Sequence, residues 1–119
     1  MRLTTTTRQA GPVTILDISG RIVLGQETAS LRSLVGDLLS KGHNKILLNL
    51  AAVDYIDSAG VGYLVGAFAS VRNHNGELKV LNPTKNVQDL MQRTKLHTIL
   101  EIKDDEATAL KSFHRTSSS

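Results

Sequence analysis

Apolar residues along this chain recur in two kinds of short segment. In one kind they form runs or alternations about as long as a β-strand, and in the other they recur near every 3.6 residues, as on one face of a helix. The segments that predict strands are residues 2–9, 13–18, 45–50, 78–81 and 98–102. The segments that predict helices begin near Gln26, Ala59, Asn82 and Asp104. The predicted order of elements is therefore β-β-α-β-α-β-α-β-α.

This order favours an α/β fold with one mixed, mostly parallel sheet. Helices that alternate with short strands are typical of parallel strands joined by right-handed crossovers. Ala10-Gly11-Pro12 predicts the turn of an antiparallel N-terminal hairpin, and Ser19-Gly20 is expected to end the second strand. The chain of 119 residues is long enough for one packed domain, expected over residues 1–113, and the tail 114–119 is expected to be disordered.

Each predicted helix has one apolar face and a marked beginning or end. The residues expected to face inward are Leu31, Leu34, Val35, Leu38 and Leu39 in the first helix, Val61, Leu64, Val65, Phe68 and Val71 in the second, Val87, Leu90 and Met91 in the third, and Ala107, Leu110 and Phe113 in the last. Asn82 is the predicted cap of the third helix, with Pro83 in its first turn. Asp104-Asp105-Glu106 places acids at the start of the last helix, where the helix dipole favours them.

The most informative stretch joins the strand at 45–50 to the second helix. Between them lies Asp57-Ser58-Ala59-Gly60, a turn that carries a helix N-cap. Either Asp57 or Ser58 can cap, because both have a short side-chain oxygen that accepts from the N–H groups of the first turn. The Ser58 hydroxyl then lies at the positive end of a helix dipole, where a phosphate with roughly two negative charges would be favoured.

Three glycines follow this turn, and they have two explanations. Gly60, Gly62 and Gly66 each weaken a helix by about 1 kcal/mol relative to Ala. Gly62 and Gly66 lie one turn apart and leave a stripe without side chains. Tight packing against the preceding strand explains the glycines, and so does an accessible face around Ser58 for a partner protein. A Ser or Asp at this place is most often a cap alone, worth ~1 kcal/mol.

Composition excludes several other kinds of site. The chain has no Cys, and its four His residues (His43, His74, His97 and His114) show no metal-ligand spacing, so we expect neither a metal nor another cofactor. The net charge is +3 with Lys and Arg scattered, and two Tyr and two Phe provide no stacking platform for nucleic acid. No apolar run is long enough to cross a bilayer and no signal peptide is evident, so the expected location is the cytoplasm.

A second signal comes from Leu48-Asn49-Leu50 followed by Asp57-Ser58-Ala59-Gly60-Val61-Gly62. This stretch is similar to the strand ending and the Asp-Ser-(Ser/Ala)-Gly-Leu-Gly signature of STAS domains, specifically the bacterial anti-sigma factor antagonists of the sporulation stage II AA and stress-response types. The resemblance covers about residues 12–113. It includes Ile18-Ser19-Gly20, Gly76-Glu77-Leu78 and Thr94-Lys95-Leu96.

The resemblance implies a binding module without enzymatic activity. In that family the serine after the Asp is phosphorylated by a partner that is both serine kinase and anti-sigma factor, so Ser58 would be the phosphoacceptor. The unphosphorylated domain binds this partner and frees a sigma factor, and a serine phosphatase resets the switch. The implied contact surface consists of Asp57, Ser58, Ala59, Gly60, Val61 and Gly62. A weak homodimer is left open.

One loop departs from the family pattern. The family usually carries an Asp after the equivalent of Gly20 that helps to engage the kinase, whereas this chain reads Arg21-Ile22-Val23-Leu24-Gly25-Gln26, with Val23 where the acid would fall. The loop therefore bears on the choice of partner.

Two other functions compete with this one. A STAS subunit of a membrane transporter complex would not need a phosphoserine switch. A serine hydrolase would need Gly on both sides of the nucleophile, but Ile56 stands at the first of these positions, and a His would have to be brought to Ser58 from elsewhere. No Walker A or Gly-x-Gly-x-x-Gly pattern follows a strand, which argues against a nucleotide site.

Overall fold

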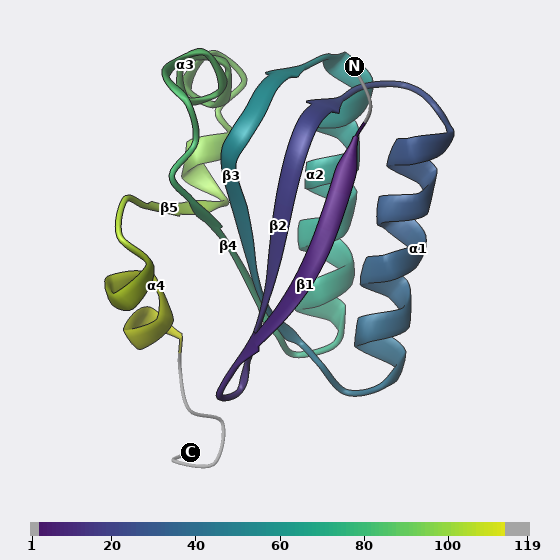
Figure 1. Ribbon diagram of the computed structural model, residues 1–119, viewed down its shortest axis with the longest axis vertical. Coiled ribbons are helices and arrows are strands. Elements are labelled where there is room, and N and C mark those ends of the chain that lie inside the picture. Colours follow the sequence, from purple (N-terminus) through teal and green to yellow (C-terminus); the bar gives the residue numbers. More distant parts are fainter. Residues whose placement is uncertain (1–2, 114–119) are drawn as a thin grey trace.

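The computed structural model describes residues 3–113, except for the side chain of Glu27. Within them, five strands form one sheet in the order β1-β2-β3-β4-β5, with β1 antiparallel to β2 and the other neighbours parallel (Figure 1). The elements are β1 (Thr4–Ala10), β2 (Val13–Ile22), α1 (Gln26–Ser40), β3 (Lys45–Ile56), α2 (Ser58–Asn73), β4 (Glu77–Leu81), α3 (Lys85–Arg93), the 3₁₀ turn η1 (Leu96–Thr98), β5 (Glu101–Lys103) and α4 (Glu106–Ser112). The predicted fold class is confirmed, with η1 as an added element. The predicted tail 114–119 lies outside the described residues.

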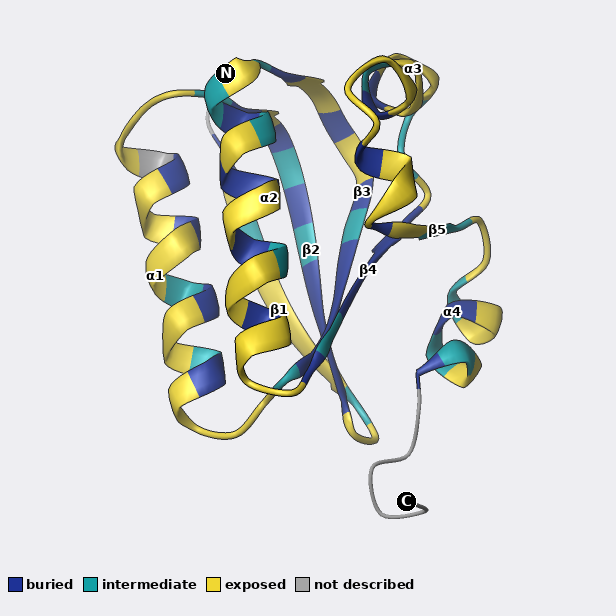
Figure 2. Ribbon diagram, turned by 180° about the vertical axis from the view of Figure 1, so that it is seen from behind, coloured by how far each residue is buried: buried dark blue, intermediate teal, exposed yellow. Residues whose placement is uncertain are grey.

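The two faces of the sheet are covered by different helices. Figure 2 shows α1 and α2 side by side over one face, and the short α4 packs near β4 and β5. Apolar residues of β2 contribute to the core on both faces of the sheet, because successive side chains of a strand point to opposite sides. Leu16 and Ile18 belong to the large apolar cluster beneath α1 and α2, whereas Val13 and Ile15 belong to a smaller cluster with Ala109 of α4.

Strand β2 continues through the Ser19-Gly20 break that the sequence predicts. It pairs with β3 as far as Ile22, but the register shifts between Asp17 and Ser19 and again between Gly20 and Arg21. Gly20 has φ 107°, a conformation that residues with a side chain rarely adopt. The glycine therefore bends the strand by an irregularity of the bulge type and does not end it.

Strand β3 is also longer than the predicted segment 45–50. It runs to Ile56, because the residues after Leu50 continue to pair with the end of β2. This extension is hard to read from the sequence, since Asp54 and Tyr55 are exposed and only Val53 and Ile56 are buried in it. Because β3 is longer, it ends at Ile56 beside Ile22, the last residue of β2, and α2 begins directly afterwards.

The inward face of α2 differs from the predicted one. Its buried residues are Gly60, Tyr63, Leu64, Ala67 and Val71. Val65, which the periodicity predicts to face inward, is 42 % exposed, and Val61 and Phe68 are only partly buried at the edge of the core. Small residues form part of the inward face because they allow the helix axis to lie close to the sheet.

Of the three glycines in α2, Gly60 lies very close to the ends of β2 and β3, whereas Gly62 and Gly66 do not. A Cβ at position 60 would lie 2.1 Å from the Ile22 carbonyl oxygen and 2.6 Å from Cγ2 of Ile56. At Gly62 and Gly66 a Cβ would meet nothing within 4 Å. Tight packing therefore explains Gly60, whereas Gly62 and Gly66 are exposed and leave an open surface on α2.

The predicted start of α3 is wrong by two residues. Thr84, and not Asn82, caps the helix, because its hydroxyl oxygen accepts from the N–H of Val87 at 3.3 Å. Asn82 has φ 51°, and its N–H donates to the carbonyl of Lys103 at 2.8 Å, beyond the last paired residues of β4 and β5. Tertiary pairing with β5 thus overrides the local capping preference of Asn82.

The C-terminal segment contains a shorter strand than the predicted 98–102. Thr98 ends the 3₁₀ turn η1, and β5 contains only Glu101–Lys103. The last helix begins after Asp105, whose carboxylate accepts from the Thr108 N–H at 2.9 Å, as its acidic start predicts. Ala107 is exposed, however, and Ala109 takes the inward position beside Phe113.

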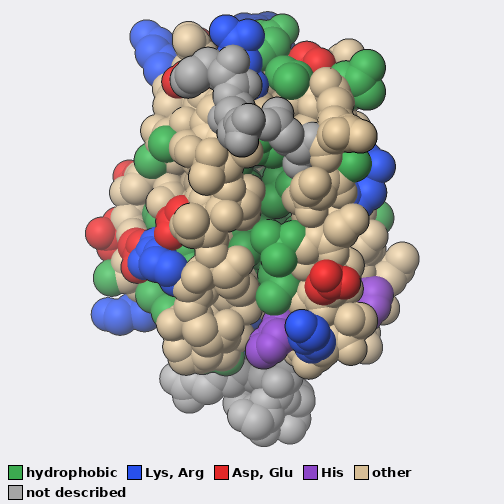
Figure 3. All heavy atoms as spheres, turned by 45° about the vertical axis from the view of Figure 1, so that its right-hand side comes forward, with side chains coloured by type: hydrophobic (Ala, Val, Ile, Leu, Met, Phe, Trp, Pro, Cys, Tyr) green, Lys and Arg blue, Asp and Glu red, His purple; other side chains and the backbone are tan. Residues whose placement is uncertain are grey.

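Polar contacts hold α4 to the sheet and to the N-terminal hairpin. Lys79 is 5 % exposed, and its ammonium donates to the carbonyl of Ser112 at 2.7 Å and lies 4.9 Å from the centre of the Phe113 ring. Arg8 of β1 forms ion pairs with Asp17 and Glu106. On the face drawn in Figure 3, Lys and Arg are interspersed with Asp and Glu and form no continuous basic patch.

The first prediction compares the two kinds of glycine in α2. Gly60→Ala should lower the free energy of unfolding by about 2 kcal/mol or more, because the new methyl group overlaps backbone that cannot move away easily. Gly62→Ala is the matched control and should raise it by about 0.5–1 kcal/mol, because Ala favours the helix and meets open space. Urea unfolding followed by circular dichroism measures both. Equal effects of the two substitutions would contradict the assignment of Gly60 as the close contact.

A second prediction concerns the hydroxyl of Tyr63. Tyr63 is 2 % exposed, and within the described residues its hydroxyl has no hydrogen-bond partner; burial also raises its pKa. Tyr63→Phe should raise the free energy of unfolding by about 0.5–1.5 kcal/mol, because it removes a buried polar group that gains nothing in return. Tyr55→Phe, at a residue that is 52 % exposed, should change it little. A clear loss of stability in Tyr63→Phe would show that the hydroxyl is hydrogen-bonded.

Candidate functional site

The ends of β2 and β3 meet the first turn of α2 at one edge of the sheet. Ile22 and Ile56 end these strands and pair with each other. Asp57 alone connects β3 to α2, and its N–H donates to the Ile22 carbonyl at 3.3 Å. Open α/β sheets commonly recognise ligands beyond the carboxyl ends of their strands. The Asp57-Ser58 turn is therefore both the sequence-predicted site and a favourable place in the fold.

Asp57 is the N-cap of α2, which settles the choice that the sequence left open. Its backbone is extended (φ −91°, ψ −175°), and its Oδ1 accepts from the Gly60 N–H at 2.8 Å. Its Oδ2 accepts from the Leu24 N–H at 3.1 Å, in the loop that leads into α1. The hydrogen bonds from Gly60 and Leu24 lower the pKa of the Asp57 carboxyl below its ordinary value, so it is ionised at neutral pH.

Ser58 is the first residue of α2, and its side chain is exposed. Asp57 already supplies the cap, and none of the described residues forms a hydrogen bond with the Ser58 side chain. The hydroxyl is accessible from solvent at a helix end whose N–H groups and dipole favour an anion. It can therefore accept a modifying group without breaking an existing contact.

The remaining residues of the signature divide into an inner and an outer set. Gly60 is buried against β2, and Ala59 and Val61 are half-buried. Gly62 is exposed on the same side of α2 as Ser58, because residues four apart lie one above the other on a helix. Val65 extends this exposed side by a further turn. Within the predicted contact surface, Gly60 therefore positions the turn, while Ser58 and Gly62 face outward.

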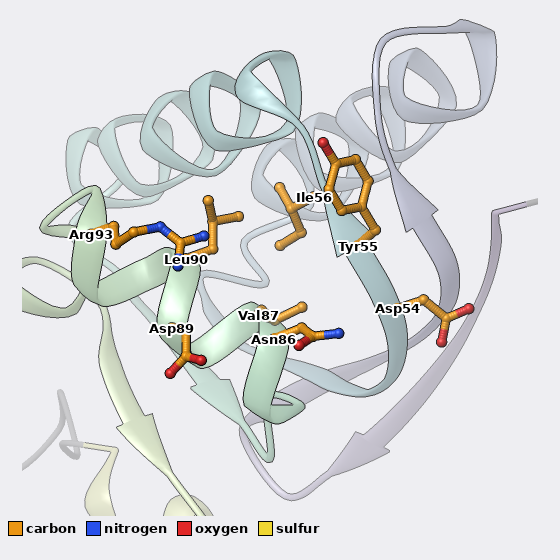
Figure 4. A pocket seen from close by; sticks show the side chains of 8 residues that line it. All are labelled: Asp54, Tyr55, Ile56, Asn86, Val87, Asp89, Leu90 and Arg93. Carbon is orange, nitrogen blue, oxygen red and sulfur yellow. The ribbon is translucent and has the colours of Figure 1, made fainter.

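A groove of about 280 Å³ opens beside Ser58, between α2, the end of β3 and α3. Its lining residues are Tyr55, Ile56, Asp57, Ser58, Val61, Leu90, Arg93 and Thr94. It shares Tyr55, Ile56, Leu90 and Arg93 with a neighbouring hollow of about 300 Å³, shown in Figure 4. Ser58 therefore lies at the rim of a concave surface.

The contribution of α3 to this groove is not predicted by the sequence. Leu90 and Arg93 are three residues apart, so helical spacing places them on one side of α3. The periodicity assigns Leu90 to the core, where it is in fact only partly buried. No local pattern says that this side of α3 faces the end of β3, because the packing of α3 on β3 is a long-range contact.

A family model described as the STAS domain matches residues 4–109 of this chain. The chain belongs to the STAS domain family. A protein of Thermotoga maritima named as an anti-sigma factor antagonist is 32 % identical to it over 79 residues, which are 66 % of this chain and 70 % of that protein. A homologue of the same name in Thermotoga neapolitana is 36 % identical over 75 residues, 63 % of this chain and 66 % of that protein.

Solved structures share the fold of this STAS domain. The crystal structure of an anti-sigma factor antagonist from Thermotoga maritima has a TM-score of 0.86 at 27 % identity and covers 93 % of this chain and 95 % of that chain. The Bacillus cell fate determinant SpoIIAA in its phosphorylated form has a TM-score of 0.72 at 17 % identity and covers 91 % of this chain and 97 % of that chain. A sulfate transporter family protein from Wolinella succinogenes has a TM-score of 0.69 at 17 % identity and covers 86 % of this chain and 84 % of that chain. At 17 % identity, the last two show the fold alone.

The loop between β2 and α1 of this STAS domain presents an apolar side chain. Leu24 is 81 % exposed, although its N–H is held by the Asp57 carboxylate. Val23, the residue before it in the loop, is half-buried. The sequence marks this loop as unusual but contains no signal for Leu24, because its bond to Asp57 depends on packing.

Other chemistry at the STAS domain's turn has less support in the structure. No histidine is among the described residues that line the groove, so a hydrolytic triad with Ser58 is not assembled there. The described residues also contain no group of His, Asp or Glu side chains placed to hold a metal ion. None of the described helices is long and apolar enough to cross a membrane.

A third prediction tests the anchoring role of Asp57. Asp57→Ala should lower the midpoint of urea unfolding at pH 7, because the Gly60 and Leu24 N–H groups lose their acceptor. Since the folded pKa lies below the ordinary 3.8, this stabilisation is complete above pH 3.8 and is lost as the pH falls through the folded value. The difference in the midpoint of urea unfolding between the parent and Asp57→Ala should therefore become smaller at acidic pH.

The control for this measurement is Asp104→Ala, which removes an exposed carboxylate that does not cap a helix. It should shift the midpoint much less than Asp57→Ala at pH 7. A difference for Asp57→Ala that stays constant down to pH 2 would contradict the role of the ionised carboxylate.

Proposed function

We propose that this STAS domain is an anti-sigma factor antagonist whose binding is controlled by phosphorylation of Ser58. In its unphosphorylated form it binds an anti-sigma factor that is also a serine kinase, and a sigma factor is thereby released. Phosphate on Ser58 breaks the complex, and a serine phosphatase restores the binding form. The protein acts in the cytoplasm by binding and has no catalytic activity of its own.

The observation that carries this proposal is the exposed Ser58 hydroxyl, which makes no hydrogen bond with any described residue. Because Asp57 performs the capping, the serine is not needed to begin the helix. The names of the relatives from Thermotoga support the antagonist role, since both are named for opposing an anti-sigma factor. An acceptor hydroxyl at this place provides the means of switching that role off.

The surroundings of Ser58 support a protein partner over a small molecule. Of the four large hydrophobic side chains that are exposed in the described residues, Leu24, Tyr55 and Val65 belong to the β2–α1 loop, the end of β3 and α2, the three segments joined at the Asp57-Ser58 turn. Leu24 is joined to the turn through Asp57, Tyr55 lines the groove with Ser58, and Val65 is on the same side of α2. Exposed apolar side chains that cluster around one point are typical of an interaction surface.

The loop supplies an apolar contact in place of the family's acid. Leu24 projects from the position next to Val23, and at 81 % exposure it is available to enter a pocket on a partner. An exposed leucine is recognised by burial of its apolar surface, whereas a carboxylate needs a cationic or hydrogen-bonding group opposite it. The kinase of this protein should therefore present an apolar pocket to the loop.

Phosphate at Ser58 should act on binding and leave the fold intact. The N–H groups and dipole at the start of α2 favour an anion there by ~0.3–1 kcal/mol, so the domain should remain folded. In the complex, roughly two charges and a bulky group would enter a surface shaped for a hydroxyl. Repulsion and loss of hydration in such an interface cost several kcal/mol by order of magnitude, which is enough to dissociate the complex.

The fourth prediction tests the switch with two variants of Ser58. Ser58→Asp should keep the melting temperature nearly unchanged and weaken partner binding at least about tenfold, which is ~1.4 kcal/mol. Ser58→Ala should bind nearly as the parent does but accept no phosphate from the kinase. Isothermal titration calorimetry with the partner and a kinase assay with radiolabelled ATP measure these effects.

A matched control is Ser33→Asp, which places the same charge at an exposed serine of α1. It should leave partner binding within about twofold of the parent. If Ser58→Ala is still phosphorylated stoichiometrically, or if Ser58→Asp binds the partner as tightly as the parent does, Ser58 is not the switch residue.

A further inference from the structure

Arg93, the last residue of α3, lines the groove together with Ser58 of α2. Its side chain is exposed, and its guanidinium forms no ion pair or hydrogen bond with any described residue. Figure 4 shows the Arg93 side chain extending along α3 toward Leu90, on the side of the helix that faces Ile56. The guanidinium is therefore available on the concave surface that Ser58 borders.

The charges around the groove make Arg93 distinctive. Among the described residues that line the groove and the neighbouring hollow, Arg93 is the only basic one. The acidic residues are Asp57 in the groove and Asp54 and Asp89 in the hollow. Asp57 is engaged by the Gly60 and Leu24 N–H groups, and Asp89, one turn before Arg93, does not pair with it. A phosphate on Ser58 would thus meet one available cation among several carboxylates.

We propose that Arg93 binds the phosphate group of phosphorylated Ser58 and thereby joins the first turn of α2 to the end of α3. The planar guanidinium presents paired N–H donors that match two phosphate oxygens. Ile56, Val61 and Leu90 line the same groove, so the pair is partly shielded from water by apolar side chains. Shielding strengthens the attraction between opposite charges relative to an open surface.

This contact would deepen the proposed switch, and its biological role rests on that proposed function. A phosphate held by Arg93 lies over the groove, so a partner loses access to the apolar wall as well as to the Ser58 hydroxyl. Asp at position 58 carries a single charge on a shorter side chain and should reproduce this closure poorly. Phosphorylation should therefore reduce partner binding further than Ser58→Asp does.

The fifth prediction uses the full chain with phosphoserine installed at position 58 during translation. The second pKa of a phosphoserine is about 6, and a bound guanidinium lowers it because it favours the dianion. In a ³¹P NMR titration, the pKa should be lower in the parent than in Arg93→Gln by at least about 0.3 unit. Arg93→Lys should give an intermediate value, because it keeps the charge and loses the paired donors.

The matched control is Arg72→Gln, which removes the same charge from α2 at a site where the guanidinium lies 6.0 Å from the centre of the Phe68 ring, outside the groove. It should leave the phosphoserine pKa within about 0.1 unit of the parent. If Arg93→Gln titrates as the parent does, or Arg72→Gln shifts the pKa equally, Arg93 does not bind the phosphate. Amide NMR spectra of unphosphorylated Arg93→Gln should match the parent, which separates a lost contact from a disturbed fold.

The design also distinguishes this inference from the proposed function. Because the phosphate is installed without a kinase, the titration decides whether Arg93 binds it even if no kinase of the host acts on Ser58. Failure of the kinase assay would overturn the switch, whereas an unchanged titration of Arg93→Gln would overturn the Arg93 contact alone.

Discussion

The close contact between Gly60 and the end of β2 determines where α2 begins and which way its first turn faces. A Cβ there would lie 2.1 Å from the Ile22 carbonyl oxygen, so a side chain would force the helix away from the sheet. Residues two apart on a helix lie on nearly opposite sides, because each residue turns the helix by about 100°. Burying Gly60 therefore exposes Ser58. The same contact brings Asp57 close enough to bond both the helix and the Leu24 loop.

The adjacent residues Asp57 and Ser58 have different tasks for a physical reason. A carboxylate with two oxygens can accept from Gly60 and Leu24 at once, and the ionised form is favoured by both bonds. A hydroxyl could replace only one of these acceptors. Since the aspartate supplies the structural contacts, the serine hydroxyl can be modified with little effect on the fold. Under the proposed function, these two adjacent polar residues separate stability from regulation.

The fold by itself does not decide the function, since a sulfate transporter family protein shares it at low identity. The distinguishing features lie at one edge of the sheet, where an accessible hydroxyl and a guanidinium without a partner among the described residues line one groove, which also contains the exposed Tyr55. These features come from the end of β3, the start of α2 and the end of α3. Their convergence favours a recognition surface that changes when its charge changes.

The order of strands and helices, the turn at Asp57-Ser58 and the acidic start of α4 could be predicted from the sequence, because periodicity and helix capping act locally. The sequence alone could not choose Asp57 over Ser58 as the cap, since both offer a suitable oxygen. It also could not show that Val65 faces solvent, that the Leu24 N–H bonds the Asp57 carboxylate, or that Arg93 lines a groove with Ser58. Those outcomes depend on contacts between elements far apart along the chain, which exist only after the helices have packed on the sheet.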